Sequence, residues 1–260
     1  MRKFWAGIGI AVVLTLTGAS AAAAELYVAL GDSYSSGTGT RTYFDSGCQK
    51  SVYAYPSLVD VQRPNTDLVF AACSGATTTN VLNSQVSSLT ANTNWVTITI
   101  GGNDAGFSSV ITECAQPGWF SNCDGAINTA QSFINNTLPA RLTNVYNEIK
   151  TRSPNAIVIV LSYPRLFMGV DCNAGTFFSG SEMTRLNQTA DLLRNVTQTR
   201  ALAAGANFRF KDAIPPFVGH AVCSSSEWIN GLSNPIGESY HPNRTGHSSG
   251  YAPLVRQVMN

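Results

Sequence analysis

Ser33 is the first polar residue whose surroundings suggest chemistry, because it follows a short apolar run in the segment Gly31-Asp32-Ser33-Tyr34-Ser35. A serine hydroxyl is a weak nucleophile until a neighbouring base takes its proton, and it works best where a strand turns sharply into a helix. Alone, a Gly-Asp-Ser tripeptide more often caps a helix in a turn. The assignment of Ser33 as a nucleophile therefore depends on the groups that accompany it.

An attacked ester carbonyl becomes an oxyanion, which needs hydrogen-bond donors already pointed at it. Three groups in the chain could supply them. Gly75 offers a backbone N–H with no side chain in the way, Asn103 offers an amide N–H, and Ser33 offers its own backbone N–H. Each is an ordinary turn residue by itself, so their joint presence is what predicts an oxyanion hole.

The base for such a serine must be a histidine, and the chain contains His220, His241 and His247. We favour His241, which lies in a polar turn, residues 238–243, just before a predicted final helix. His247 falls inside that helix, which indicates a structural role. His220 lies in a loop rich in proline and glycine, which is typical of a surface residue.

These candidates follow the predicted strands of an α/β fold. Short apolar runs alternate with longer amphipathic ones, the pattern of parallel strands joined by helices. The predicted strands are residues 26–30, 67–71, 95–100, 156–161 and 207–210. The predicted helices are residues 52–62, 126–152, 181–204 and 244–258. Ligands bind at the carboxyl ends of the strands in such a sheet, and the turns that carry Ser33, Gly75 and Asn103 should converge there.

Together, Gly31-Asp32-Ser33, Gly75, Gly102-Asn103-Asp104 and His241 resemble the four sequence blocks of the SGNH hydrolases, also called GDSL hydrolases. The blocks span nearly the whole chain after residue 24, in the family's order. The resemblance implies a three-layer α/β/α, flavodoxin-like fold with about five parallel strands. It also implies Ser33 as nucleophile, His241 as base, and Gly75 and Asn103 in the oxyanion hole. The similarity is greatest to the secreted bacterial lipases, phospholipases and esterases with three disulfides.

One position departs from the family pattern. The family commonly has an aspartate three residues before the histidine, where this chain has Glu238. In some relatives a main-chain carbonyl two residues before the histidine replaces the acid, which here is that of Ser239. We favour the Ser239 carbonyl as the group that orients His241, with Glu238 as the alternative. Asp32 and Asp104 each adjoin a block residue and are expected to fix their loops through backbone N–H groups.

The first 24 residues predict a signal peptide, because a basic start, an apolar run over residues 4–16 and small residues at 22–24 follow one another. Residues 25–260 should then form one secreted domain. The six cysteines favour disulfides in an exported chain. Their grouping suggests sequential bridges, which are Cys48 to Cys73, Cys114 to Cys123, and Cys172 to Cys223.

The composition and the motifs of the chain limit the classes of molecule that it is expected to bind. Charged residues make up 12% of the chain and the formal net charge is +1, so bulk charge does not favour nucleic acid. The apolar run at the start is too short for a membrane span. No motif indicates a cofactor, and the cysteine and histidine spacing does not suit a metal site. We expect a monomer whose partner is an acyl-ester or lipid substrate.

The combined expectation is a secreted lipase or esterase, with phospholipase activity included, that acts through an acyl-enzyme on Ser33. Loop aromatics such as Trp119, Phe120 and Phe177 could form an acyl groove or touch a lipid–water interface. Alternatively, these side chains could form small hydrophobic clusters that pack under long loops. The alternatives are a polysaccharide O-deacetylase on the same scaffold and a secreted binding protein without catalysis.

Overall fold

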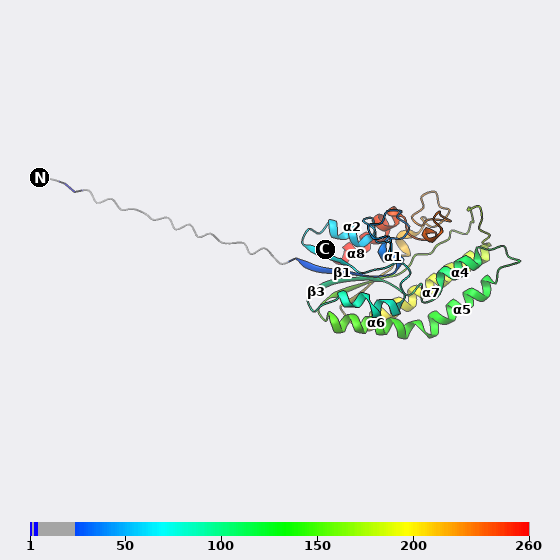
Figure 1. Ribbon diagram of the computed structural model, residues 1–260, viewed down its shortest axis with the longest axis horizontal. Coiled ribbons are helices and arrows are strands. Elements are labelled where there is room, and N and C mark those ends of the chain that lie inside the picture. Colours follow the sequence, from blue (N-terminus) through cyan, green and yellow to red (C-terminus); the bar gives the residue numbers. More distant parts are fainter. Residues whose placement is uncertain (2, 5–23, 260) are drawn as a thin grey trace.

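A five-stranded sheet lies at the centre of the computed structural model, which describes residues 1, 3, 4 and 24–259 (Figure 1). The strands are β1 (Glu25–Gly31), β2 (Thr66–Phe70), β3 (Thr93–Thr99), β4 (Ile157–Leu161) and β5 (Phe208–Lys211). Their order is β2-β1-β3-β4-β5 and every neighbouring pair is parallel. The predicted α/β fold is confirmed, and each predicted strand overlaps an observed one.

Helices cover both faces of the sheet. On one face, α2 (Tyr55–Val61) packs against α8 (Ala252–Met259), beside the short α1 (Ser33–Ser36). On the other face, α6 (Leu138–Arg152) packs with α3 (Thr78–Asn83) and α7 (Gly180–Ala204), while α4 (Phe107–Cys114) and α5 (Cys123–Asn136) continue this layer (Figure 1). The result is a three-layer arrangement with the core between the sheet and each helical layer.

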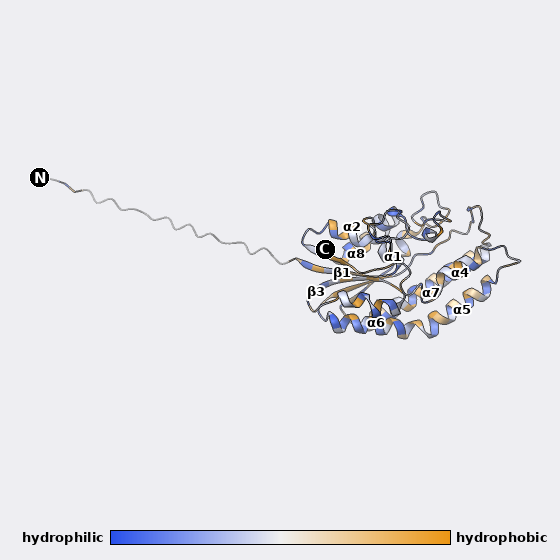
Figure 2. Cartoon of the chain, in the orientation of Figure 1, coloured by the Kyte–Doolittle hydropathy of each residue, from blue (hydrophilic) through white to orange (hydrophobic). Residues whose placement is uncertain are grey.

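The strands read as continuous apolar runs because both of their faces are covered. Tyr27, Val28, Ala29 and Leu30 in β1 are all fully buried. The helices show the complementary pattern, with apolar residues toward the sheet and polar residues outward (Figure 2). This packing fixes the carboxyl end of β1, where Ser33 begins α1.

The helix predictions need three corrections. Residues 126–152 do not form one helix, because α5 ends at Asn136 and α6 begins at Leu138. Pro139 explains the break, since proline lacks an N–H and is tolerated only in the first turn of a helix. The predicted helix 244–258 starts instead as a π-helix, Gly246–Tyr251, that leads into α8. The short helices α3 and α4 lie in segments for which no helix was predicted.

Three disulfides join the cysteines in sequential order: Cys48–Cys73, Cys114–Cys123 and Cys172–Cys223. The pairing suggested by their grouping is therefore confirmed. The second bridge closes the loop between α4 and α5, and the third ties the segment before α7 to the segment after β5.

The predicted signal peptide, residues 1–24, falls almost entirely outside the described residues. Among the helices that the structure does describe, none combines the length and the apolar character that a membrane crossing requires.

Candidate active site

Ser33 occupies the first helical turn after β1, at the carboxyl edge of the sheet. Asp32 caps α1, because its Oδ1 accepts a hydrogen bond from the Tyr34 backbone N–H at 3.0 Å. Gly31 makes the sharp turn possible with a φ of 125°, and a Cβ there would lie 2.5 Å from the Thr99 carbonyl oxygen. In the Gly-Asp-Ser segment, Gly31 therefore allows the turn, Asp32 caps the helix and Ser33 carries the hydroxyl.

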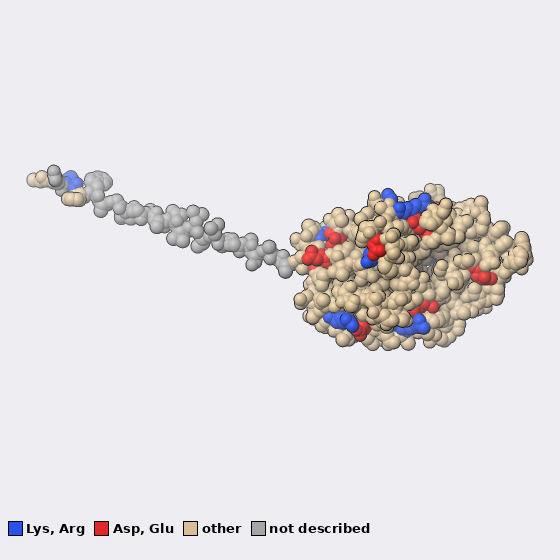
Figure 3. All heavy atoms as spheres, viewed as in Figure 1, with Lys and Arg blue, Asp and Glu red and all other residues tan. Residues whose placement is uncertain are grey.

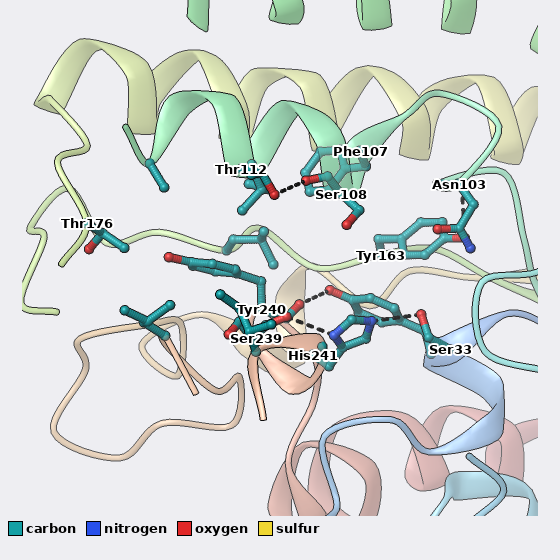
Figure 4. A pocket seen from close by; sticks show the side chains of 18 of the residues that line it. Ser33, Asn103, Phe107, Ser108, Thr112, Tyr163, Thr176, Ser239, Tyr240 and His241 are labelled. Carbon is teal, nitrogen blue, oxygen red and sulfur yellow. Dashed lines mark hydrogen bonds between the residues drawn. The ribbon is translucent and has the colours of Figure 1, made fainter. Parts of the chain in front are cut away.

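His241 lies directly against Ser33 (Figure 4). Its Nε2 is 2.8 Å from the Ser33 Oγ, and its Nδ1 is 2.8 Å from the main-chain oxygen of Ser239. A carbonyl only accepts hydrogen bonds, so Nδ1 carries the ring proton and Nε2 has a lone pair for the serine hydroxyl. Burial lowers the pKa of His241 to about 4, with the Ser239 carbonyl acting in the opposite direction. The imidazole is therefore neutral near pH 7 and able to accept a proton.

Tyr34 connects the helix that carries Ser33 to the turn that carries His241. Its hydroxyl donates to the Tyr240 carbonyl oxygen at 2.7 Å, and its ring centroid lies 5.4 Å from that of His241. Tyr240 has a φ of 59°, an uncommon value for a residue that is not glycine. The residue after Ser33 thus holds the turn that carries His241, although 206 positions separate Tyr34 from Tyr240 in the sequence.

Glu238 is turned away from His241. Its side chain is buried, and its Oε1 accepts a hydrogen bond from the Tyr43 hydroxyl at 2.6 Å. Its Oε2 faces the Nε of Arg41 at 3.5 Å. The Tyr43 hydroxyl in turn accepts a hydrogen bond from the Gly39 backbone N–H at 3.1 Å. Glu238 therefore anchors the loop after α1, while the Ser239 carbonyl occupies the position beside the imidazole.

Gly75 and Asn103 line the same pocket as Ser33. Gly75 has a φ of 78°, and no atom lies within 4 Å of the place where a Cβ would stand. The Asn103 side-chain amide donates one N–H to the Ala76 carbonyl oxygen at 2.9 Å, which leaves its second N–H for another acceptor. The structure thus brings Ser33, Gly75, Asn103 and His241 together at one edge of the sheet, as the sequence predicted for their loops.

Asp104 connects the Asn103 turn to the helix that follows Gly75. Its carboxylate accepts hydrogen bonds from the Thr78 N–H at 2.8 Å and from the Thr78 hydroxyl at 2.5 Å. Arg141 on α6 lies 3.1 Å from the same carboxylate. The loops that carry Gly75 and Asn103 are therefore held against each other by a buried, paired carboxylate.

Asp32 makes a second link that the sequence did not reveal. Its Oδ2 accepts a short hydrogen bond from the Tyr163 hydroxyl, and this hydroxyl accepts one from the Gly102 backbone N–H at 3.1 Å. Burial raises the pKa of Asp32 to about 7, while the bond from Tyr163 acts to lower it. Tyr163 lies two residues after the end of β4, so the rule that sites lie at the carboxyl ends of parallel strands could have indicated it.

The pocket beside Ser33 has a volume of about 500 Å³ and a largely apolar lining. It runs from Ser33 and Asn103 between α4 and the segment that carries Tyr240 and His241 (Figure 4). Phe107 and Ile111 line it from α4, and Phe177, Leu232 and Ile236 lie around its outer part. A groove of this kind has the shape and lining to accommodate an apolar chain beside Ser33.

The other histidines lie outside this pocket. His247 is fully buried, its Nδ1 accepts a hydrogen bond from the Tyr55 N–H at 3.2 Å, and burial lowers its pKa to about 3. His220 stacks on Trp228 with ring centroids 3.8 Å apart.

The sequence also contains one G-x-S-x-G pattern, at residues 246–250. It lies in the π-helix, and its central Ser248 is exposed and does not line the pocket.

In the part of the chain that the structure describes, Cys172, Cys223 and Glu227 are the one group of side chains with atoms close enough to share a metal ion. The two sulfurs are bonded to each other, and the Glu227 Oε1 accepts a hydrogen bond from the Cys223 N–H at 2.5 Å. Disulfide sulfurs are not the thiolates that metals bind, so this cluster is a structural one.

Comparisons with known proteins agree with this geometry. The model of the GDSL-like lipase/acylhydrolase family matches residues 29–248. Lipase 1 of Streptomyces coelicolor is 42% identical over 238 residues, which cover 90% of this chain and 87% of that protein. Crystal structures of an extracellular lipase from Streptomyces rimosus and of phospholipase A1 from Streptomyces albidoflavus NA297 are similar to this fold, with TM-scores of 0.83 and 0.84. Both are 41% identical, and each match covers 90% of this chain and 99% of the other.

A family two carbohydrate esterase from Clostridium thermocellum has a TM-score of 0.53 at 12% identity, over 90% of this chain and 62% of that one. This likeness extends to the fold alone. The family match over residues 29–248 and the identity to lipases along most of the chain show that the protein belongs to the GDSL-like lipase/acylhydrolase family and is a carboxylic-ester hydrolase.

Proposed function

We propose that Ser33 is the nucleophile of this ester hydrolase and that His241 is its general base. The observation that carries the proposal is the 2.8 Å distance from the Ser33 Oγ to the His241 Nε2, combined with the contact between Nδ1 and the Ser239 carbonyl. The carbonyl fixes the tautomer in which Nε2 is free to take the serine proton. These two contacts support a Ser33 and His241 dyad that is oriented by the main chain.

The proposed reaction has two steps. The Ser33 Oγ bonds to the ester carbonyl carbon while its proton moves to the His241 Nε2, and the carbonyl electrons move to the oxygen. The N–H groups of Ser33 and Gly75 and the Asn103 amide stabilise that oxyanion. When the intermediate collapses, the alcohol leaves with the proton from His241. Water then attacks the acyl-enzyme with His241 as base, and the carboxylic acid is released.

We further propose that the substrates are lipid esters, either acylglycerols or phospholipids. The support is the apolar groove that leads away from Ser33 along α4, together with the relatives that are named lipases and phospholipase A1. The acyl chain would lie against Phe107 and Ile111, with its carbonyl at Ser33. The enzyme would act after export, which the three disulfides and the predicted signal peptide support, and would act as a monomer.

A panel of p-nitrophenyl esters of rising chain length tests the proposal. Ser33→Ala should lower kcat/KM by at least about 10⁴-fold on every ester, because the nucleophile is lost while binding is kept. Ser108→Ala is the matched control, since Ser108 lines the same pocket away from His241. Equal activity in Ser33→Ala and the unmodified enzyme would disprove the role of Ser33.

The ester panel, an acetyl-xylan assay and labelling with a fluorophosphonate together separate the two alternatives. A polysaccharide O-deacetylase would hydrolyse acetyl-xylan and lose activity sharply as the p-nitrophenyl ester lengthens. A binding protein without catalysis would leave Ser33 unlabelled by a fluorophosphonate. The lipases at 42% identity favour neither of them, and the carbohydrate esterases share the fold alone.

A further inference from the structure

The mouth of the Ser33 pocket is formed by three loops at one end of the molecule (Figure 1). They are residues 115–122 between α4 and α5, residues 172–180, which end at the first residue of α7, and residues 228–237 before His241, and together we call them the rim. The rim contains no charged residue, although the whole chain has 16 Lys and Arg and 15 Asp and Glu. Figure 3 shows few charged atoms around the hollow at this end.

Large apolar side chains project from the rim into solvent. Trp119 is 80% exposed, Phe120 is 75% exposed and Ile236 is 76% exposed, and Phe177 is also exposed. Other aromatic residues near these loops, Phe167 and Phe178, are buried and pack on each other, so the loops do have a core of their own. Trp119 and Phe120 are not part of that core, which leaves them for contact with something outside the chain.

Hydrogen bonds join the three loops of the rim to one another. The Phe177 N–H donates to the Ala115 carbonyl oxygen at 3.1 Å, which joins the first loop to the second. The Leu232 N–H donates to the Asn173 Oδ1 at 3.2 Å, which joins the second loop to the third. Pro117, Phe177 and Ile236 all line the pocket that contains Ser33. A surface that contacts the rim therefore lies directly over the entrance to the acyl groove.

Covalent bonds hold the rim in place. Cys114–Cys123 closes the loop that carries Trp119 and Phe120, and Cys172–Cys223 begins the second loop. Because one disulfide ties both ends of the first loop and another ties the start of the second, these two loops lose little conformational entropy when they bind, and the apolar area they remove from water contributes to affinity.

We propose that the rim docks onto an electrically neutral lipid–water surface, so that an acyl chain can pass from the lipid into the groove. The inference rests on the proposed function, because a lipid ester is the substrate that such a surface would deliver. The absence of charge excludes attraction to acidic headgroups as the driving force, so binding is hydrophobic and insensitive to salt. A protein partner bound to the rim would cover the entrance to the groove without delivering an acyl chain. Binding of a protein there would therefore count against the proposal.

The test uses the chain from residue 24 onward, which contains every described helix and strand but lacks the apolar run at the start. Ser33→Ala is included in all samples so that vesicles stay intact. Partitioning onto phosphatidylcholine vesicles is measured by co-sedimentation, and the part of the tryptophan emission shift that is lost in Trp119→Ser reports the transfer of this side chain from water, since Trp95 and Trp228 also emit. Trp119→Ser with Phe120→Ser should weaken partitioning at least about tenfold, since two aromatic side chains supply much of the buried area.

Val61→Ser with Leu202→Ser is the matched control. Both residues are exposed and apolar, but they lie near the ends of α2 and α7, which lead into the amino ends of β2 and β5 at the opposite edge of the sheet. This control should partition like the parent protein, and raising NaCl from about 50 to 500 mM should not weaken binding. Equal partitioning of the rim variant and the control would overturn the proposal. Binding confined to anionic vesicles, or dimerisation through the rim without vesicle binding, would do the same.

Activity assays then separate this inference from the proposed function. With Ser33 restored, the rim variant should keep its kcat/KM on dissolved p-nitrophenyl acetate and lose activity about tenfold on phosphatidylcholine vesicles or an emulsified triacylglycerol. Vesicle binding without any ester hydrolysis would refute the proposed function and leave the docking surface intact. Hydrolysis that is equal in the rim variant and the control on both substrates would refute the docking surface alone.

Discussion

The carboxylate of Glu238 accepts a hydrogen bond from the Tyr43 hydroxyl at 2.6 Å, although Glu238 stands three residues before His241, where an orienting acid is expected. The acid at this position therefore supports the loop after α1. The imidazole contacts a main-chain oxygen instead, which offers a hydrogen bond without a full negative charge. This difference determines how the enzyme should respond to mutation and to pH.

Glu238→Gln should change kcat/KM by less than about threefold, because the glutamine oxygen can still accept the Tyr43 hydrogen bond and His241 keeps its Ser239 carbonyl. In serine proteases, loss of the orienting acid lowers kcat by about 10⁴-fold. Tyr43→Phe is the matched variant, since it removes the same hydrogen bond from the other side. Steady-state kinetics on a dissolved ester checks the prediction, and a loss of about 10³-fold or more in Glu238→Gln would assign the orienting role to Glu238.

The pH dependence should show a base of low pKa. Because burial lowers the pKa of His241 to about 4, kcat/KM should rise with pH through about 4 and stay level toward neutrality. A pH–rate profile on a dissolved ester at constant ionic strength measures this limb. A limb near 6.5, the ordinary pKa of histidine, would contradict the buried, neutral imidazole.

The free energy of unfolding should also depend on pH through His241. The unfolded chain binds a proton at His241 below about 6.5, whereas the folded chain does so only below about 4. The unfolded state therefore holds more protons in this window, and the free energy of unfolding should fall as pH drops through it. Urea unfolding at several pH values tests this. His241→Gln should have a shallower pH dependence, and an unchanged slope would show that His241 does not contribute.

Tyr163→Phe should lower kcat about tenfold with little change in KM, because it removes the hydroxyl that joins Asp32 to the Gly102 N–H and so loosens the turn carrying Asn103. Tyr146→Phe is the control, since the Tyr146 hydroxyl is buried without a hydrogen-bond partner. The control should keep full activity. Equal kinetics in the two variants would exclude a positioning role for Tyr163.

Removing a disulfide should cost more stability when the loop that it closes is longer, with the cost rising as the logarithm of loop length. Replacing Cys114 and Cys123 by serine should lower the free energy of unfolding by about 2 to 3 kcal/mol, since they are 9 residues apart, and replacing Cys172 and Cys223 by about 4 kcal/mol, since they are 51 apart. Denaturant unfolding gives both values. The reverse order would show that native packing, rather than loop closure, dominates.

The sequence predicted the strands well because buried parallel strands are continuous apolar runs between turns, as in residues 26–30 of β1. It placed Ser33, Gly75 and Asn103 in converging loops for the same reason. It predicted the helices less well. Pro139 signals the break at Thr137, but the longer pattern over residues 126–152 outweighed it. The Thr77 side chain caps α3 together with Asn80, which is a local signal for a helix that was not predicted.

Other features depend on contacts between distant segments. The direction of the Glu238 side chain is set by Tyr43 and Arg41, which are far away in the sequence and give no periodic signal. The Tyr163 hydroxyl reaches Asp32 across 131 positions. Sequence patterns indicate which residues lie at an edge of the sheet, but the partner of each side chain follows from the packing of the finished fold.

The three disulfides enclose separate stretches of the chain, residues 48–73, 114–123 and 172–223, and none of these stretches overlaps another. A chain that crosses a membrane from its amino end therefore delivers each pair of cysteines completely before the first cysteine of the next pair emerges. The disulfides can therefore form one after another during translocation. A non-native bridge would form only if a cysteine reacted with a cysteine of another pair and not with its native partner, which is the next or the previous cysteine in the sequence. In the exported chain that we propose, sequential pairing would therefore limit the number of wrong bridges that have to be rearranged.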